Sequence, residues 1–130
     1  MISDPVSAIR VMSRDLSLVE ISNSIGNSTS GFSIGDAYSK GKRLREHSCW
    51  LFEVDKGIRK NFRDQLNYLL DIVEGQYEAY SKLNDNQCQL DITCCLAIEN
   101  GQGAIELGSK LLNRFSKLDL NLMFDLYSFE

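Results

Sequence analysis

The feature that most constrains the fold of this chain is an alternation of apolar and polar residues in three separate segments. Residues 88–98 and 120–127 place an apolar side chain at every second position. In residues 43–54, one face carries Leu44, Trp50, Phe52 and Val54. Because successive side chains of a strand point to opposite faces, this pattern predicts half-buried β-strands. The strands of a doubly wound parallel sheet read instead as continuous apolar runs. The alternation therefore favours a largely antiparallel sheet with helices on one side.

Three other segments show the periodicity of amphipathic helices. Apolar residues recur at every third or fourth position in 17–25, 58–83 and 107–118. The first segment opens with the capping-box spacing of Ser17 and Glu20. Gly75 interrupts the longest of the three segments, so a kink or a break is expected there.

The order of these segments defines the predicted fold. With a further short strand over 6–12, the elements follow one another as β-α-β-α-β-α-β. A chain of 130 residues has the usual length of one domain. We therefore predict one α+β domain over 1–130, with three helices and a largely antiparallel sheet of four to five strands. The Ser-, Gly- and Asn-rich stretch 27–41 is predicted as a long loop, with room for a hairpin strand over 35–40.

The same periodicities predict the hydrophobic core. One face of the sheet should pack against the helices through eight side chains: Trp50, Phe52, Leu90, Ile92, Leu112, Phe115, Leu122 and Phe124. Leu44 shares the apolar face of its strand, and Ile58 and Tyr77 share that of the central helix.

Compartment and cofactors follow from what the sequence carries. The four cysteines form no CxxC pair and no cluster with histidine, so we expect reduced thiols, no metal and no cofactor. The first residues show neither the basic nor the apolar region of a signal peptide. No apolar run approaches the roughly 20 residues that a membrane span needs. The protein is expected to be cytoplasmic.

Motifs that would carry catalysis are weak in this chain. His47 is the only histidine and shares a strand face with Cys49, but no third group orients them, so we expect an exposed surface histidine. The stretch 101–103 is a GxG without the third glycine of a phosphate-binding loop. The basic cluster in 40–45 is best explained as a solvated strand edge. An enzyme is therefore not predicted.

Charge is distributed unevenly along the chain. Residues 1–65 contain ten Lys and Arg against eight Asp and Glu, a net charge of +2. Residues 66–130 contain four against ten, a net charge of −6. An acidic surface repels phosphate, which disfavours nucleic-acid binding, and it would suit a basic protein partner. Ordinary surface charge for solubility is the simpler explanation of a net charge this small.

Several short motifs in the right order resemble a known family. They are Gly35-Asp36, Gly41-Lys42, Ser48-Cys49-Trp50 and the spaced closing series in residues 118–127, Leu118, Leu120, Leu122, Asp125 and Tyr127. Together they resemble family four-two-seven-nine of bacterial domains of unknown function, over nearly the whole chain. The resemblance brings no activity with it. Some relatives look like immunity proteins of contact-dependent growth inhibition systems, which share this small, acidic profile.

The resemblance implies a function that can be tested. We predict an immunity protein that binds the C-terminal domain of a cognate toxin, a nuclease by expectation, and neutralises it by direct contact. The alternative is a non-catalytic interaction or ligand-sensing module inside the cell. The predicted toxin-binding residues are the acidic side chains of the second half: Asp71, Glu74, Glu78, Asp85, Asp91 and Glu99. The stretch 27–41 is the alternative contact region.

Overall fold

The structure is a computed structural model that describes residues 2–129, with side chains from Asp4 onward. In chain order its elements are β1 (Ile2–Ser13), α1 (Leu18–Ile25), β2 (Ser30–Phe32), β3 (Ala37–Tyr38), β4 (Arg43–Leu44), β5 (Ser48–Glu53), α2 (Phe62–Gly75), α3 (Tyr77–Asp85), β6 (Gln89–Glu99), α4 (Ser109–Leu118) and β7 (Asn121–Phe129).

The strands form one main sheet and one hairpin. The main sheet has five strands in the order β2-β5-β1-β6-β7, and β3 pairs with β4 separately. All neighbours in the main sheet are antiparallel except β6 and β7, which are parallel. The parallel pair arises because α4 carries the chain back across the sheet before β7 begins. The predicted α+β class and largely antiparallel sheet are confirmed.

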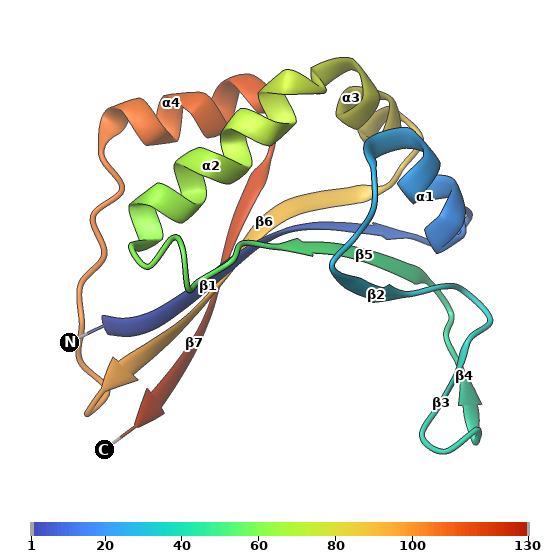
Figure 1. Ribbon diagram of the computed structural model, residues 1–130, viewed down its shortest axis with the longest axis horizontal. Helices are drawn as coiled ribbons and strands as arrows, with labels where there is room; N and C mark the ends of the chain where they lie inside the picture. Colours follow the sequence, from blue (N-terminus) through green and yellow to red (C-terminus); the bar gives the residue numbers. More distant parts are fainter. Residues whose placement is uncertain (1, 130) are drawn as a thin grey trace.

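The helices lie on one side of the sheet. Figure 1 shows α1, α2, α3 and α4 above it, and none of the helices in residues 2–129 lies below it. The sheet bends, so that the β3-β4 hairpin descends at one end and the last residues of β6 and β7 descend at the other. One face of the sheet is thus covered by helices and the opposite face is left uncovered.

The core fills the space between the sheet and the helices. Trp50 on β5 is 2% exposed, and its indole Nε1 donates a hydrogen bond to the carbonyl of Gly26 at 2.9 Å. Ile9 and Ile92 contribute from β1 and β6, and Leu66 from α2. Seven of the eight predicted core residues lie in this cluster or pack against it: Trp50, Phe52, Leu90, Ile92, Phe115, Leu122 and Phe124.

The prediction of three helices is wrong, because the central segment forms two. Gln76, at φ −130° and ψ 36°, lies outside the helical region and separates α2 from α3. Its N–H donates to the carbonyl of Val73, which closes the last turn of α2. After this break the chain buries Tyr80 and Leu83, whereas Tyr77, predicted on the apolar face, is 48% exposed.

The predicted element order is also incomplete. The stretch 27–41 is not a single loop, since it contains β2 and β3, and the expected hairpin is the pair β3-β4. The strand predicted over 43–54 is two strands, β4 and β5. Leu44 is 62% exposed because β4 pairs only with β3, outside the main sheet.

Two further apolar residues lie outside the core. α2 begins at Phe62, since the side chain of Asn61 caps it by accepting from the N–H of Arg63 at 2.8 Å. Ile58 therefore precedes the helix, in a turn, and is exposed. Leu112 was predicted in the core but is 50% exposed, because the buried face of α4 is formed by Leu111 and Phe115.

Candidate functional site

Two of the predicted toxin-binding residues are held by an arginine of another helix. Arg114 on α4 binds Asp71 through Nη2 at 2.6 Å and Glu74 through Nε at 3.0 Å. Its Nη1 also donates to Asn67 on α2 at 2.8 Å. The hydrogen bond to Glu74, and then that to Asp71, raise the pKa of Arg114 above its usual range. These contacts fasten α4 to α2, and they offset part of the negative charge of Asp71 and Glu74.

A surface hollow brings Glu74 and Glu78 together. It has a volume of about 740 Å³ and lies where α2 breaks and α3 begins, with Ser24 of α1 on its border. Its lining includes both glutamates, the exposed ring of Tyr77 and Lys82. We call this feature the α2–α3 hollow. The predicted residues of the central segment are therefore divided between two helices, with Asp71 and Glu74 on α2 and Glu78 on α3, and the two glutamates border the same hollow.

The other three predicted residues lie elsewhere. Asp85 is exposed at the end of α3 and borders a separate cavity of about 90 Å³. Glu99 is the half-buried last residue of β6. The structure thus distributes the six acidic residues over both the helix layer and the sheet, and it does not gather them into one patch.

Asp91 is an internal ion-pair partner. Its two carboxylate oxygens accept from Nε and Nη2 of Arg10 at 3.1 and 2.6 Å, and its side chain is only 5% exposed. This hydrogen bond raises the pKa of Arg10. Because a buried charge that loses its partner is strongly destabilising, the primary role of Asp91 is structural. The sequence could not reveal this, since Arg10 precedes Asp91 by 81 positions.

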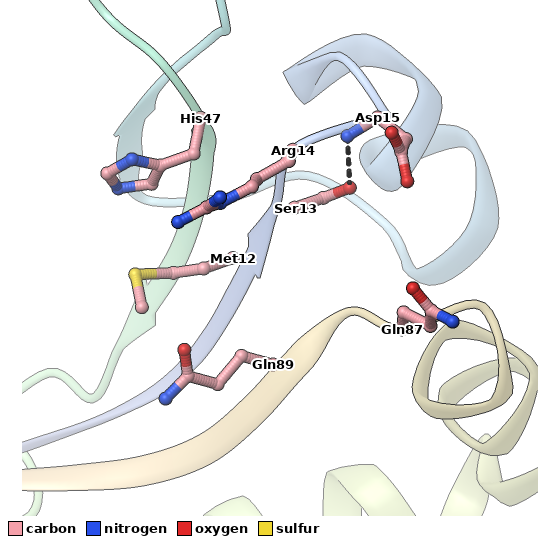
Figure 2. A pocket seen from close by; sticks show the side chains of 7 residues that line it. All are labelled: Met12, Ser13, Arg14, Asp15, His47, Gln87 and Gln89. Carbon is pink, nitrogen blue, oxygen red and sulfur yellow. Dashed lines mark hydrogen bonds between the residues drawn. The ribbon is translucent and has the colours of Figure 1, made fainter.

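A second hollow surrounds the only histidine. It has a volume of about 440 Å³, and the side chains of Figure 2 line it: Met12, Ser13, Arg14, Asp15, His47, Gln87 and Gln89. Arg14 extends toward His47 above Met12 and Gln89. Within residues 2–129, the side chains of Arg14, Gln87 and Gln89 have no hydrogen-bond partner. We call this feature the His47 hollow. It presents unpaired donors from three positions that no sequence motif connects.

His47 is half-buried, so the expectation of an exposed histidine is wrong. Its ring and that of Phe32 make a T-shaped contact, with 5.5 Å between the centroids and 70° between the ring planes. The guanidinium of Arg45 lies over Phe32 at 3.9 Å and over Tyr38 at 4.2 Å. These contacts attach the β3-β4 hairpin to the main sheet. One member of the basic cluster in 40–45 is thus a structural anchor.

The cysteines are free thiols in the structure. Cys88 and Cys94 are buried, and Cys49 and Cys95 are half-buried. Burial raises the pKa of Cys94 to about 11, although the Ser7 hydroxyl, which lies 3.2 Å from its sulfur, acts in the opposite direction. Burial also raises the pKa of Cys49, which disfavours the thiolate that a nucleophile would need.

The described residues contain neither a cluster of metal ligands nor a helix that could cross a membrane. Between residues 2 and 129, no three His, Cys, Asp or Glu side chains lie close enough together to hold a metal ion. None of the helices in that range combines the length and the apolar character required to cross a membrane.

The fold and these two hollows define a small α+β domain that presents one uncovered sheet face. Over residues 5–129 the chain matches the family described as domain of unknown function (DUF4279), and it belongs to that family. The resemblance seen in the short motifs is therefore confirmed. No curated protein and no solved structure matches the chain.

Proposed function

We propose that this protein is a non-catalytic cytoplasmic immunity protein, which binds the C-terminal domain of a cognate bacterial toxin and blocks it. The observation that carries the proposal is the α2–α3 hollow, where Glu74, Glu78 and the exposed Tyr77 surround one concavity. Tyrosine is enriched among the residues that contribute most binding energy at protein interfaces. A tyrosine flanked by two carboxylates suits a protruding basic side chain.

Charge supports a nuclease as the toxin. A nuclease needs a basic surface to meet phosphate, and an acidic inhibitor can occupy that surface. Complementary charges mainly accelerate association and make it sensitive to salt. Of the two carboxylates in the hollow, Glu78 has no ion-pair partner among the described residues, whereas Glu74 is shared with Arg114. Glu78 is therefore the stronger candidate for contact with a cation.

Contacts between α4 and α2 hold one side of the hollow in a fixed position. Arg114 joins α4 to α2 through three side chains of α2, one of which is Glu74 at the border of the hollow. A side chain that is already ordered loses less conformational entropy on binding. The uncovered sheet face and the 27–41 segment lie outside this arrangement, and we place the contact at the helix layer.

The experiment is co-expression with the toxin domain encoded beside this gene. The toxin alone should kill the cells, and the toxin with this protein should spare them and co-purify with it. Tyr77→Ala should raise the dissociation constant roughly 10- to 100-fold, the range of an interface hot spot. Glu78→Lys should slow association and flatten its dependence on salt.

The matched control is Glu46→Lys, which makes the same change in net charge at an exposed position between β4 and β5. It should leave both binding and protection unchanged. Equal losses from Glu78→Lys and Glu46→Lys would show that net charge, and not the hollow, decides binding. A neighbouring gene product that neither harms cells nor binds would refute the immunity function.

The second candidate is a ligand-sensing module, and the His47 hollow is the observation that favours it. Arg14, Gln87 and Gln89 leave their donors unpaired around this concavity. Gln87 also adopts a positive φ of 64°, a conformation that is uncommon outside glycine and that occurs at binding sites. The same co-expression result decides between the candidates, because a sensor would give no protection against a toxin.

A further inference from the structure

The last strand of the sheet leaves a long edge open. β7 has nine residues and, of the strands in residues 2–129, pairs only with β6, so its other side is an edge of the main sheet. The opposite edge strand, β2, has only three residues. Proteins protect sheet edges by shortening them or by placing Pro, Lys or a bulge there. β7 contains no proline and no basic residue, and Asp125 is its one charged side chain.

Exposed apolar side chains concentrate on this strand. Of the ten large hydrophobic residues that are exposed in the described part of the chain, β7 contributes four. They are Met123, Leu126, Tyr127 and Phe129, with exposed fractions between 37% and 51%. Met123, Tyr127 and Phe129 share one face of the strand, and Leu126 lies on the other. A single exposed apolar residue needs no explanation, whereas a contiguous group such as these three marks an interaction surface.

The backbone of β7 is oriented to accept another strand. The carbonyl of Phe129 accepts from the N–H of Asn100, which follows β6, so it points toward β6. Since the N–H and C=O groups of a strand change sides at each residue, Leu122, Phe124 and Leu126 point their backbone groups to the open edge. These donors and acceptors need a partner strand or water.

Helix α4 offers a second apolar contact on the same side. Arg114 turns toward α2, and at 100° per residue Leu112 lies on the opposite flank of α4. Only two residues separate α4 from β7, so the end of the helix is next to this edge strand. The half-exposed Leu112 therefore faces away from α2, toward the side on which the sheet ends.

We propose that the protein forms a twofold symmetric dimer in which β7 pairs antiparallel with β7 of a second copy. The two five-stranded sheets then become one continuous sheet of ten strands, and the edge is closed. A twofold axis perpendicular to the sheet keeps both helix layers on the same side. It brings the Leu112 flank of each copy toward the helix layer of the other.

Sequence complementarity selects the register of this pairing. Two residues that lie directly opposite each other in neighbouring strands have their side chains on the same face of the sheet. Because side chains alternate along β7, this condition is met only when the twofold axis passes through a residue and not between two residues. An axis at Asp125 would bring two carboxylates together. An axis at Leu126 pairs Leu126 with its own copy, Met123 with Phe129, and Asp125 with Tyr127. This register covers all four exposed apolar side chains of β7 and separates the like charges.

The experiment measures the oligomeric state by sedimentation equilibrium up to about 100 µM, a range that detects micromolar dimers. The wild-type protein should show twice the 14.7 kDa mass of one chain. Leu126→Lys should be monomeric, because it places two ammonium groups at the axis. Leu44→Lys, the same substitution at an exposed leucine of β4, is the matched control and should remain dimeric.

A pair of variants at one exposed position tests the register without risk to the fold. Tyr127→Asp would face Asp125 of the second copy twice in the dimer, and it should raise the dissociation constant about tenfold or more. Tyr127→Lys would gain two opposite-charge pairs and should stay dimeric. Equal behaviour of these two variants, a monomeric wild-type protein, or open-ended higher oligomers would each overturn the proposal. None of these measurements uses the toxin, so they stand apart from the proposed function.

Discussion

At the scale of single residues, the hydroxyl of Tyr80 is a buried polar group without a partner. Tyr80 is 3% exposed, and its hydroxyl makes no hydrogen bond within residues 2–129. Burial raises its pKa to about 12 from the usual 10.0. A buried polar group that stays unsatisfied destabilises a fold by about 1–3 kcal/mol. The ring of Tyr80 therefore stabilises the core by packing, whereas its buried hydroxyl destabilises the fold.

Tyr80→Phe should stabilise the protein by about 1 kcal/mol at pH 8, because it removes the unsatisfied hydroxyl and keeps the ring. The difference should grow at pH 11. Between pH 10 and about 12 the phenol of Tyr80 stays protonated in the folded protein but ionises in the unfolded chain, because burial raises its folded-state pKa. The wild-type protein therefore loses stability as the pH rises through this range, and Tyr80→Phe does not. Urea unfolding of both proteins at the two pH values measures this. A variant that is less stable at pH 8 would show that the hydroxyl has a partner, such as water in the adjacent cavity.

At the scale of elements, two glycines have opposite roles. Gly31 in β2 has a φ of 148°, and a Cβ there would overlap the carbonyl oxygen of Cys49 in β5. This close approach lets β2 pair with β5. Gly75 ends α2 at an ordinary helical position, and a Cβ there would meet no atom within 4 Å. The first glycine is required by a contact, and the second is not.

The same substitution should therefore have opposite effects at these two sites. Gly75→Ala should stabilise the protein by roughly 0.5–1 kcal/mol, because alanine restricts the unfolded chain and favours the helix. Gly31→Ala should destabilise it by at least about 2 kcal/mol, since the β2-β5 pair has to shift. Thermal and urea unfolding give both values. A loss of stability in Gly75→Ala would mean that the break between α2 and α3 depends on the glycine itself, and not on Gln76.

At the scale of the whole molecule, Trp50 links most layers of the structure. It lies on β5, its indole is bonded to the chain after α1, and it stacks on Phe52 with ring centroids 6.3 Å apart. It belongs to the same core cluster as Leu66 of α2, Leu83 of α3 and Phe115 of α4. One continuous core beneath four helices is the physical basis for a single cooperative unit.

Unfolding should accordingly be two-state. Fluorescence of Trp50, the only tryptophan, reports the core, and far-ultraviolet circular dichroism reports the helices and strands. Both signals should give the same midpoint and the same slope in urea. Leu44→Ala serves as a control, because Leu44 is exposed on the β3-β4 hairpin and lies outside the core that contains Trp50. It should shift neither midpoint. Two separate transitions would contradict the prediction of one domain.

Local patterns in the sequence determined much of this fold. The alternation around Trp50 and Phe52 predicted β5 and its buried face, because a strand repeats every two residues whatever its partners are. The capping box at Ser17 and Glu20 is present, with both of its hydrogen bonds. Gly75 marked the position where the central helix breaks. These features depend on neighbours in sequence, so they can be deduced without tertiary structure.

Only the tertiary structure decided which polar residues are free. Asp91 looked like the other acidic residues, but Arg10 binds it from 81 positions away, and Arg114 binds Asp71 from 43 positions away. The meeting of Glu74 and Glu78 at the α2–α3 hollow and the open edge at β7 also arise from how elements pack. Charge and periodicity are properties of a segment, whereas an ion pair, a concavity or an unpaired edge exists only once distant segments meet. For this reason the sequence predicted the layers of the protein but not the surfaces that those layers create.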